Sequence, residues 1–225
     1  MMKENKGYQL IEDLKSNPIA FSKFGKSYDL LQEYFGGLSL ETLIPLLQSD
    51  DLAIQRPTIW VISELAGKGC SLLPYVLRLV DSADDYIRYY ALECILLCAK
   101  GKYIKEFVHL IRSVDDDSSS IKILAMRLLA NAEDIQLRTG LELVVEYQIE
   151  NYQLHWLGLS SLLNHDQLED HAIIDMLNSK IPLTQQYGVM VVGRRYENSP
   201  EFIKDALVSN NICVQEFARA IVNMD

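Results

Sequence analysis

The sequence has few of the residues and none of the motifs that support catalysis. Its 225 residues include four histidines and four cysteines, and no GxSxG, HExxH, Walker or CxxC sequence occurs. An activated nucleophile needs a base within hydrogen-bonding distance, and such motifs supply that contact. We therefore expect a protein that is not an enzyme and that binds no metal or cofactor.

One segment keeps a metal site open as an alternative. His165 and His171 flank the sequence NHDQLEDH, which also contains Asp166, Glu169 and Asp170. Carboxylate and imidazole groups at such spacing occur in transition-metal sites, which need several converging ligands. A solvated turn explains the same composition with fewer conditions, and we favour it.

The cysteines are too few and too scattered for a disulfide framework or a zinc site. Cys94 and Cys98 lie one helical turn apart, but no second pair of ligands accompanies them, and Cys70 and Cys213 stand alone. We expect buried free thiols. An oxidising compartment is correspondingly disfavoured.

Long apolar runs and an excess of basic charge are also missing. No apolar run approaches the roughly 20 residues of a membrane span, and the first residues lack the charged-then-apolar order of a secretory signal. We expect a cytoplasmic protein without membrane contact. The 21 basic residues are outnumbered by 31 acidic ones, for a net charge of −10, so a phosphate-binding surface is disfavoured.

What the chain does contain is a repeat. Intervals of 33, 34, 33, 30 and 30 residues separate equivalent aliphatic or small positions, and this period indicates a helical solenoid. Residues four positions later are always small, and those eight positions later are always large and aliphatic. Five of the six residues three positions earlier can cap a helix. The six equivalent positions are Ile54, Ile87, Ile121, Leu154, Thr184 and Val214.

The segment DDYIRYYA, from Asp84 to Ala91, resembles the turn D-x-x-(I/V)-R of HEAT-like repeats in the armadillo-type superfamily. DLAIQRPT, from Asp51 to Thr58, departs from it by placing Gln55 at the basic position. The resemblance covers residues 39–225 and implies an all-α fold. That fold is a right-handed α-α superhelix of about six helix pairs.

Residues 1–38 fit the repeat poorly, and we interpret them as an N-terminal helical cap. Leu10, Ile11 and Leu14 predict one helix, and the spacing of Phe24, Tyr28, Leu31 and Tyr34 predicts a second. Residues 39–225 then form the solenoid, in one continuous domain with the cap. The oligomeric state is left open.

Positions two and six residues after each repeat anchor point away from the buried stripe of the second helix. Both tryptophans fall there, with tyrosine and arginine residues that are typical of interface hot spots. These side chains either line a binding groove or are buried between neighbouring second helices, and we favour the groove. The predicted partner-binding residues are Arg56, Trp60, Tyr89, Glu93, Arg127 and Trp156.

Acidic residues collect at the turns between the two helices of a repeat. Capping needs one acceptor per helix, so the extra carboxylates would form an acidic edge. Solubility of the surface explains them with fewer conditions, and attraction of a basic partner is the alternative. The predicted members of this acidic edge are Asp50, Asp51, Asp84, Asp85, Asp115, Asp116 and Asp117.

These features predict a protein that binds another, basic protein. The most specific form is an acidic cytoplasmic inhibitor of the immunity type that neutralises a toxin. A general adaptor or assembly scaffold explains the same features. A third alternative is an alkylpurine DNA glycosylase, because some HEAT-like proteins of this size are such enzymes. The acidic balance disfavours it, since such an enzyme must hold phosphates.

Overall fold

The computed structural model describes residues 6–223, and each regular element in that range is a helix. The all-α repeat fold is therefore confirmed. None of the described helices is long and apolar enough to cross a membrane. The chain divides into two compact units, residues 1–98 and residues 99–225, and each is described by itself.

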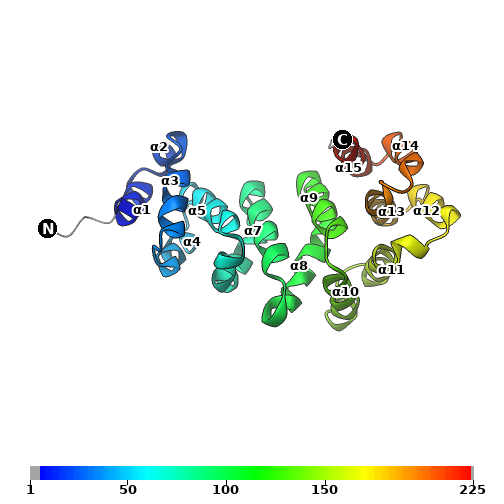
Figure 1. Ribbon diagram of the computed structural model, residues 1–225, viewed down its shortest axis with the longest axis horizontal. Coiled ribbons are helices and arrows are strands. Elements are labelled where there is room, and N and C mark those ends of the chain that lie inside the picture. The colour runs from blue at the N-terminus through cyan, green and yellow to red at the C-terminus, as the bar shows by residue number, and fades with distance from the viewer. Residues whose placement is uncertain (1–5, 224–225) are drawn as a thin grey trace. The chain divides into compact units, whose positions relative to one another are not determined.

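Unit 1, residues 1–98, contains three N-terminal helices and two repeats. Helices α3, α5 and α7 lie side by side, with α5 in contact with both neighbours (Figure 1). Its elements are α1 (Lys6–Ser16), α2 (Pro18–Lys23), α3 (Lys26–Phe35), η1 (Leu40–Leu43), α4 (Ile44–Leu47), α5 (Leu52–Glu64), η2 (Ala66–Leu72), α6 (Leu73–Val76), η3 (Leu77–Leu79) and α7 (Asp85–Cys98), where η denotes a 3-10 helix.

The N-terminal cap has three described helices, so the prediction of two was wrong. Leu10, Ile11 and Leu14 are buried on α1 as expected. The second predicted helix is divided at Gly25, whose φ of +70° lies in the left-handed region that favours glycine. Phe24 therefore lies outside α3 and is 72% exposed. Residues 1–5 of the predicted cap fall outside the described range.

Unit 2, residues 99–225, curls so that its second helices pack on one another. Helix α13 contacts α9, α11 and α15, and α15 also contacts α9 (Figure 1). Its elements are η4 (Gly101–Glu106), α8 (Phe107–Arg112), η5 (Ser113–Asp115), α9 (Ser119–Ala130), α10 (Asp134–Glu146), α11 (Tyr152–Leu163), η6 (His165–Gln167), α12 (Asp170–Leu177), α13 (Pro182–Arg195), η7 (Pro200–Phe202), α14 (Ile203–Leu207) and α15 (Ile212–Val222).

The six second helices predicted from the repeat are α5, α7, α9, α11, α13 and α15. All six small residues at the close-approach position are buried. Asp51, Asp84 and Asn211 accept backbone N–H groups of the helices that follow them, as predicted. Ser118 and Asn151 precede α9 and α11 but make no side-chain cap hydrogen bond.

Gly158 on α11 lies against the ring of Tyr187 on α13. A Cβ at this position would come within 2.1 Å of Tyr187 Cγ, well inside van der Waals contact. Tyr187 is fully buried, so displacing its ring would disturb the packing around it. The absence of a side chain at Gly158 therefore permits this helix contact.

The prediction that all cysteines are free was wrong for two of them. Cys70 in η2 and Cys98 at the end of α7 form a disulfide, with their Cα atoms 5.3 Å apart. The bond joins the two helical segments of the second repeat. Cys94 and Cys213 are buried free thiols, and burial raises the pKa of Cys94 to about 12, so this thiol stays protonated.

Reducing the disulfide should destabilise unit 1 by about 3 kcal/mol, because the bond closes a loop whose ends are 28 residues apart. Calorimetry with and without dithiothreitol measures the change. A C70S/C98S variant should be equally destabilised and should no longer respond to dithiothreitol. Four reactive thiols in air-oxidised, denatured protein, rather than two, would contradict the bond.

Replacing Gly158 with alanine should destabilise unit 2 by about 2 kcal/mol or more, because the new methyl group overlaps the Tyr187 ring. Urea unfolding followed by far-ultraviolet circular dichroism measures the loss. Gly67→Ala is the matched control, since a Cβ there meets no atom within 4 Å. Equal stability of the two variants would show that α11 and α13 do not approach so closely.

Candidate functional site

An ion pair joins Arg56 on α5 to Asp84, the residue that precedes α7. Asp84 Oδ1 accepts the backbone N–H groups of Tyr86 and Ile87, at 3.0 and 3.2 Å. Its Oδ2 accepts from Arg56 Nε and Nη2, at 2.7 and 2.6 Å. One carboxylate thus begins α7 and ties it to α5. Arg56 in turn lies 5.8 Å from the centre of the Tyr86 ring.

A pocket of about 410 Å³ opens beside this ion pair. Three aromatic residues from three different helices, Tyr28, Trp60 and Tyr86, contribute to its wall. Tyr28 and Tyr86 are 61% and 41% exposed, and Trp60 is half-buried. We call it the aromatic pocket, and it is lined by Ser22, Gly25, Ser27, Tyr28, Arg56, Pro57, Trp60 and Tyr86.

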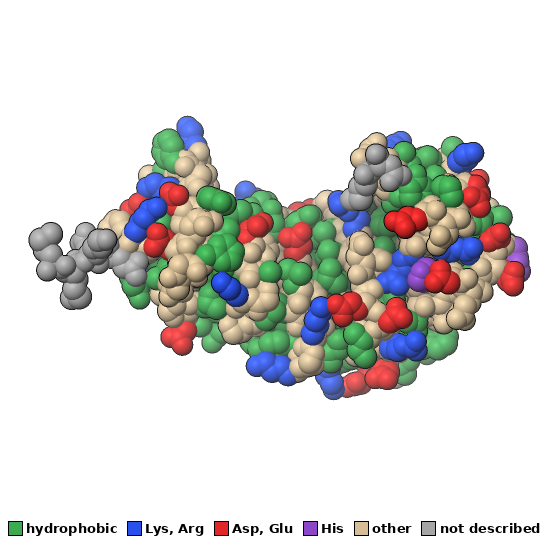
Figure 2. All heavy atoms as spheres, viewed as in Figure 1, with side chains coloured by type: hydrophobic (Ala, Val, Ile, Leu, Met, Phe, Trp, Pro, Cys, Tyr) green, Lys and Arg blue, Asp and Glu red, His purple; other side chains and the backbone are tan. Residues whose placement is uncertain are grey.

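A cluster of tyrosines on α7 lies next to the aromatic pocket. The Tyr90 ring makes edge contacts with Tyr86 and Tyr89, at centroid distances of 4.7 and 5.0 Å. Burial, then Tyr86, then Glu93 and Glu64 raise the pKa of Tyr90 to about 12. Two carboxylates are therefore within electrostatic reach of these rings. Figure 2 shows acidic side chains among hydrophobic ones over α5 and α7.

Sequence reasoning placed Arg56, Trp60, Tyr89 and Glu93 on this face, and the structure puts all four on neighbouring α5 and α7. It missed Tyr28, because the cap has no repeat register from which to assign a face. It also missed Tyr86 and Tyr90, which fall outside the two helical positions considered. The unusual run YIRYY was the signal that could have found them.

The acidic edge is less exposed in unit 1 than predicted. Asp84 is buried, so its assignment to an exposed edge was wrong. Asp51 caps α5 through the N–H of Ala53, and Asp85 pairs with Arg88 at 2.6 Å. Asp50 is exposed. Most of these carboxylates therefore have local structural partners.

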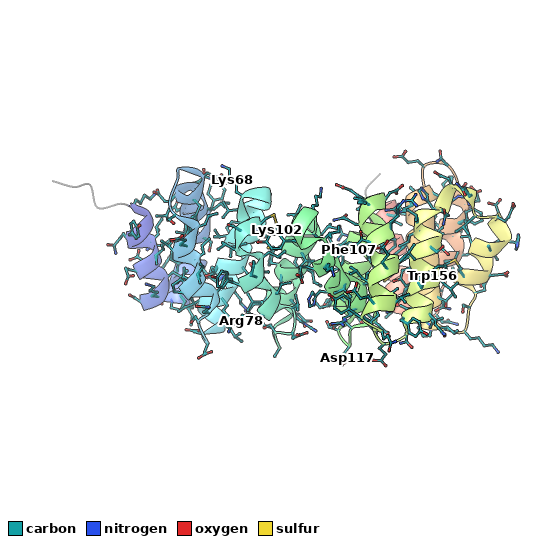
Figure 3. All side chains as sticks on the ribbon, turned by 90° about the horizontal axis from the view of Figure 1, so that it is seen from below. Lys68, Arg78, Lys102, Phe107, Asp117 and Trp156 are labelled. Atoms are coloured by element: carbon teal, nitrogen blue, oxygen red, sulfur yellow. A yellow bond between two sulfur atoms is a disulfide. The ribbon has the colours of Figure 1, made fainter. Side chains whose placement is uncertain are left out.

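The three acidic residues before α9 also differ from one another. Asp115 accepts a hydrogen bond from the side chain of Asn151, and Asp116 accepts one from the N–H of Ser118, both at 2.8 Å. Asp117 is exposed and lies at the turn, outside the helices (Figure 3). No partner within residues 6–223 holds its carboxylate. Asp117 is the member of this group that best fits an exposed acidic edge.

The outward positions of the second helices in unit 2 do not form one open groove. Arg127 is exposed on α9, and Trp156 is 42% exposed on α11 (Figure 3). The equivalent positions on α13, Gln186 and Met190, are buried where α13 contacts its neighbours. Both alternatives for these positions therefore occur: the side chains are exposed on α9 and α11 and buried on α13.

A second pocket, of about 380 Å³, lies between two turns of unit 2 and the start of helix α11. His155 lines it, although this residue is only 1% exposed. The ring atom Nδ1 of His155 lies 2.8 Å from the hydroxyl of Tyr187. Burial lowers the pKa of His155 to about 4, against an opposing effect of Asp115. His155 is therefore neutral at physiological pH.

No three His, Cys, Asp or Glu side chains in residues 6–223 converge as a metal site would require. His165 instead directs Nδ1 to the carbonyl of Leu162, at 3.0 Å. The segment between His165 and His171 forms the short helix η6 and the start of α12.

Neither a protein-family model nor a curated protein matches this sequence. Solved structures do match it along nearly their whole length. The designed armadillo repeat protein YIII(Dq)4CqI has a TM-score of 0.53 and 15% identity, over 98% of this chain and 99% of its own. The chain has an armadillo-type helical repeat fold. Two further structures are similar. The design YIII(Dq.V1)4CPAF in complex with peptide (KR)4 has a TM-score of 0.55 and 16% identity, over 98% of this chain and 99% of its own. A structural-genomics engineered protein has a TM-score of 0.53 and 15% identity, over 99% of this chain and 98% of its own.

In the armadillo-type repeats of unit 2, His155 should make stability depend on pH. The folded protein holds the pKa near 4, below the ordinary 6.5, so the unfolded chain binds a proton that the folded chain does not. Stability should therefore fall as the pH drops from 6.5 toward 4, by about 1 to 2 kcal/mol at pH 5. Urea unfolding at pH 7.5 and pH 5 measures this loss.

A H155F/Y187F double variant is the control for that titration, because it removes both partners of the buried hydrogen bond and keeps two rings of similar size. Carboxylates elsewhere titrate in both proteins, so only the difference between the two pH profiles reports His155. Identical profiles would mean that His155 is protonated as easily in the folded as in the unfolded chain.

Proposed function

We propose that the chain is a binding protein whose unit 1 grips a basic segment of another protein in the aromatic pocket, and that it does so without catalysis. The observation that supports this most is the open aromatic pocket itself, with Tyr28, Trp60 and Tyr86 on its wall. Exposed aromatic side chains that share a concavity are the usual anchors of protein interfaces.

The chemistry around the pocket favours a cationic partner. Asp84 already neutralises Arg56 through two hydrogen bonds, so the arginine adds little free positive charge to the site. Glu64 and Glu93 lie close enough to Tyr90 to raise its pKa. Tyrosine faces attract lysine and arginine side chains, and nearby carboxylates add to that attraction. The design YIII(Dq.V1)4CPAF, which has a similar fold, is in complex with peptide (KR)4.

The most specific form of the proposal is an acidic inhibitor that neutralises a basic protein such as a toxin. The net charge of −10 supports it, because an acidic surface speeds the approach of a basic partner. A cytoplasmic location belongs to the same proposal. The Cys70–Cys98 bond weighs against that location, because disulfides are rare in the reducing cytosol.

A fluorescent (Lys-Arg)4 peptide is a direct probe of the aromatic pocket. We expect it to bind the full chain, and Trp60→Ala to weaken binding by about tenfold or more because the largest ring of the pocket is lost. Fluorescence anisotropy at low and moderate salt measures both affinities. Tyr8→Ala is the matched control, since Tyr8 is an exposed aromatic outside the pocket.

Two results would overturn this proposal. One is equal binding of a (Glu)8 peptide of the same length, which would remove the preference for basic partners. The other is unchanged affinity in Trp60→Ala when circular dichroism shows that the variant is folded. An E64Q/E93Q variant separates the contribution of the carboxylates from that of the aromatic rings, because it should weaken peptide binding mainly at low salt.

A further inference from the structure

The 380 Å³ pocket of unit 2 is lined by residues of two turns and by a buried histidine of helix α11. Its lining consists of Arg112, Asp115, Tyr147, Gln148, Ile149, Glu150 and His155. Gln148, with φ of +42°, belongs to the wall, and Asn151, with φ of +53°, lies just beyond it. The backbone of both residues is in the left-handed region, which is uncommon for residues other than glycine.

The hydrogen-bonding role of His155 follows from Tyr187. Tyr187 is fully buried, and within residues 6–223 its hydroxyl has His155 Nδ1 as its hydrogen-bond partner. If Nδ1 carried the proton, the phenol hydrogen would be left unpaired in the core, which is costly. Tyr187 therefore donates to Nδ1, and the proton of the neutral imidazole resides on Nε2.

The Nε2–H group of His155 is the donor that this ring presents to the pocket. Nδ1 faces Tyr187, which is not a lining residue, so the opposite edge of the ring faces the cavity. No residue from 6 to 223 accepts a hydrogen bond from Nε2. A donor on a side chain that is 99% buried, with no partner, is a site for a ligand acceptor.

Three other groups of the pocket can also bind a ligand. The Arg112 guanidinium and the Glu150 carboxylate have no ion-pair or hydrogen-bond partner among the described residues. Asp115 uses Oδ2 to accept from Asn151, which leaves Oδ1 available. The pocket therefore offers two donors, His155 and Arg112, and two acceptors, Asp115 and Glu150.

We propose that this pocket binds the primary carboxamide of an asparagine or glutamine side chain on a protein partner. A carboxamide oxygen can accept two hydrogen bonds and its nitrogen can donate two, which matches the four groups of the pocket. A carboxylate or phosphate would be repelled by Asp115 and Glu150. An ammonium group offers no acceptor for His155, and a hydroxyl donates only once. This inference rests on the proposed binding of a protein partner, although it concerns a different unit.

The test uses small probes, so it does not require the natural partner. We expect N-acetylglutamine methylamide to shift the His155 ring ¹⁵N signals of the full chain, in a spectrum that shows the Nε2–H tautomer before any addition. N-acetylglutamate methylamide has the same shape and a negative charge, and it should bind at least about tenfold more weakly.

Substitutions in the pocket should change that preference in a defined way. Asp115→Asn keeps an oxygen for Asn151 but removes the charge, so it should narrow the difference between the two probes. Glu150→Gln should act in the same direction and should leave folding intact, because Glu150 is exposed. In the H155F/Y187F variant, neither probe should shift the backbone amide signals of residues 147–150, which the glutamine probe should shift in the unsubstituted chain.

Three results would overturn the carboxamide site. They are a proton on Nδ1 instead of Nε2, equal binding of the glutamine and glutamate probes, or no shift of the His155 signals at a glutamine-probe concentration of about 50 mM. The (Lys-Arg)4 experiment at the aromatic pocket is independent of all three. Peptide binding without a His155 response would therefore reject this site and leave the proposed function in place.

Discussion

The structure depends on close helix packing at one small, buried residue in each second helix. Thr58, Ala91, Ala125, Gly158, Gly188 and Ala218 occupy these positions, and all are buried. At Gly158 the constraint is tightest, because an aromatic ring of the next helix fills the space that a side chain would need. The position of that ring then decides where the Tyr187 hydroxyl and its partner His155 lie. A packing requirement of the repeat thus sets the chemistry of the unit 2 pocket.

The two units use the same repeat to produce different surfaces. In unit 1, α3, α5 and α7 leave aromatic side chains open between them, and the short helix α2 adds a further wall through Ser22. In unit 2, α13 lies against three other second helices and buries Gln186 and Met190. A helical face therefore stays open where each second helix contacts only its neighbours along the chain, as in unit 1, and is covered where α13 and α15 also contact α9. The number of helices that surround a position, more than the type of residue there, decides whether its side chain is exposed or buried.

Much of the fold was predictable because it depends on local patterns. The anchors, the small residues and the capping role of Asp84 follow from helical periodicity and from the need to satisfy free N–H groups. The disulfide was not predictable, since Cys70 lies outside the repeat columns and its distance from Cys98 is a property of the folded repeat. The closure of unit 2 was also missed. Contacts between helices that are not neighbours along the chain, such as α9 and α15, leave no local pattern from which they could be read.

The acidic residues show why the net charge of a chain does not locate a binding site. Asp84 contributes to the net charge of the chain, yet its carboxylate is buried and fully engaged by Arg56 and two backbone N–H groups. Asp85 and Asp116 likewise serve nearby groups. Glu64 and Glu93, which formed no part of the predicted acidic edge, act on the tyrosines beside the aromatic pocket. An acidic composition therefore does not identify a site, and the proposed function rests instead on the few carboxylates that the fold leaves near exposed rings.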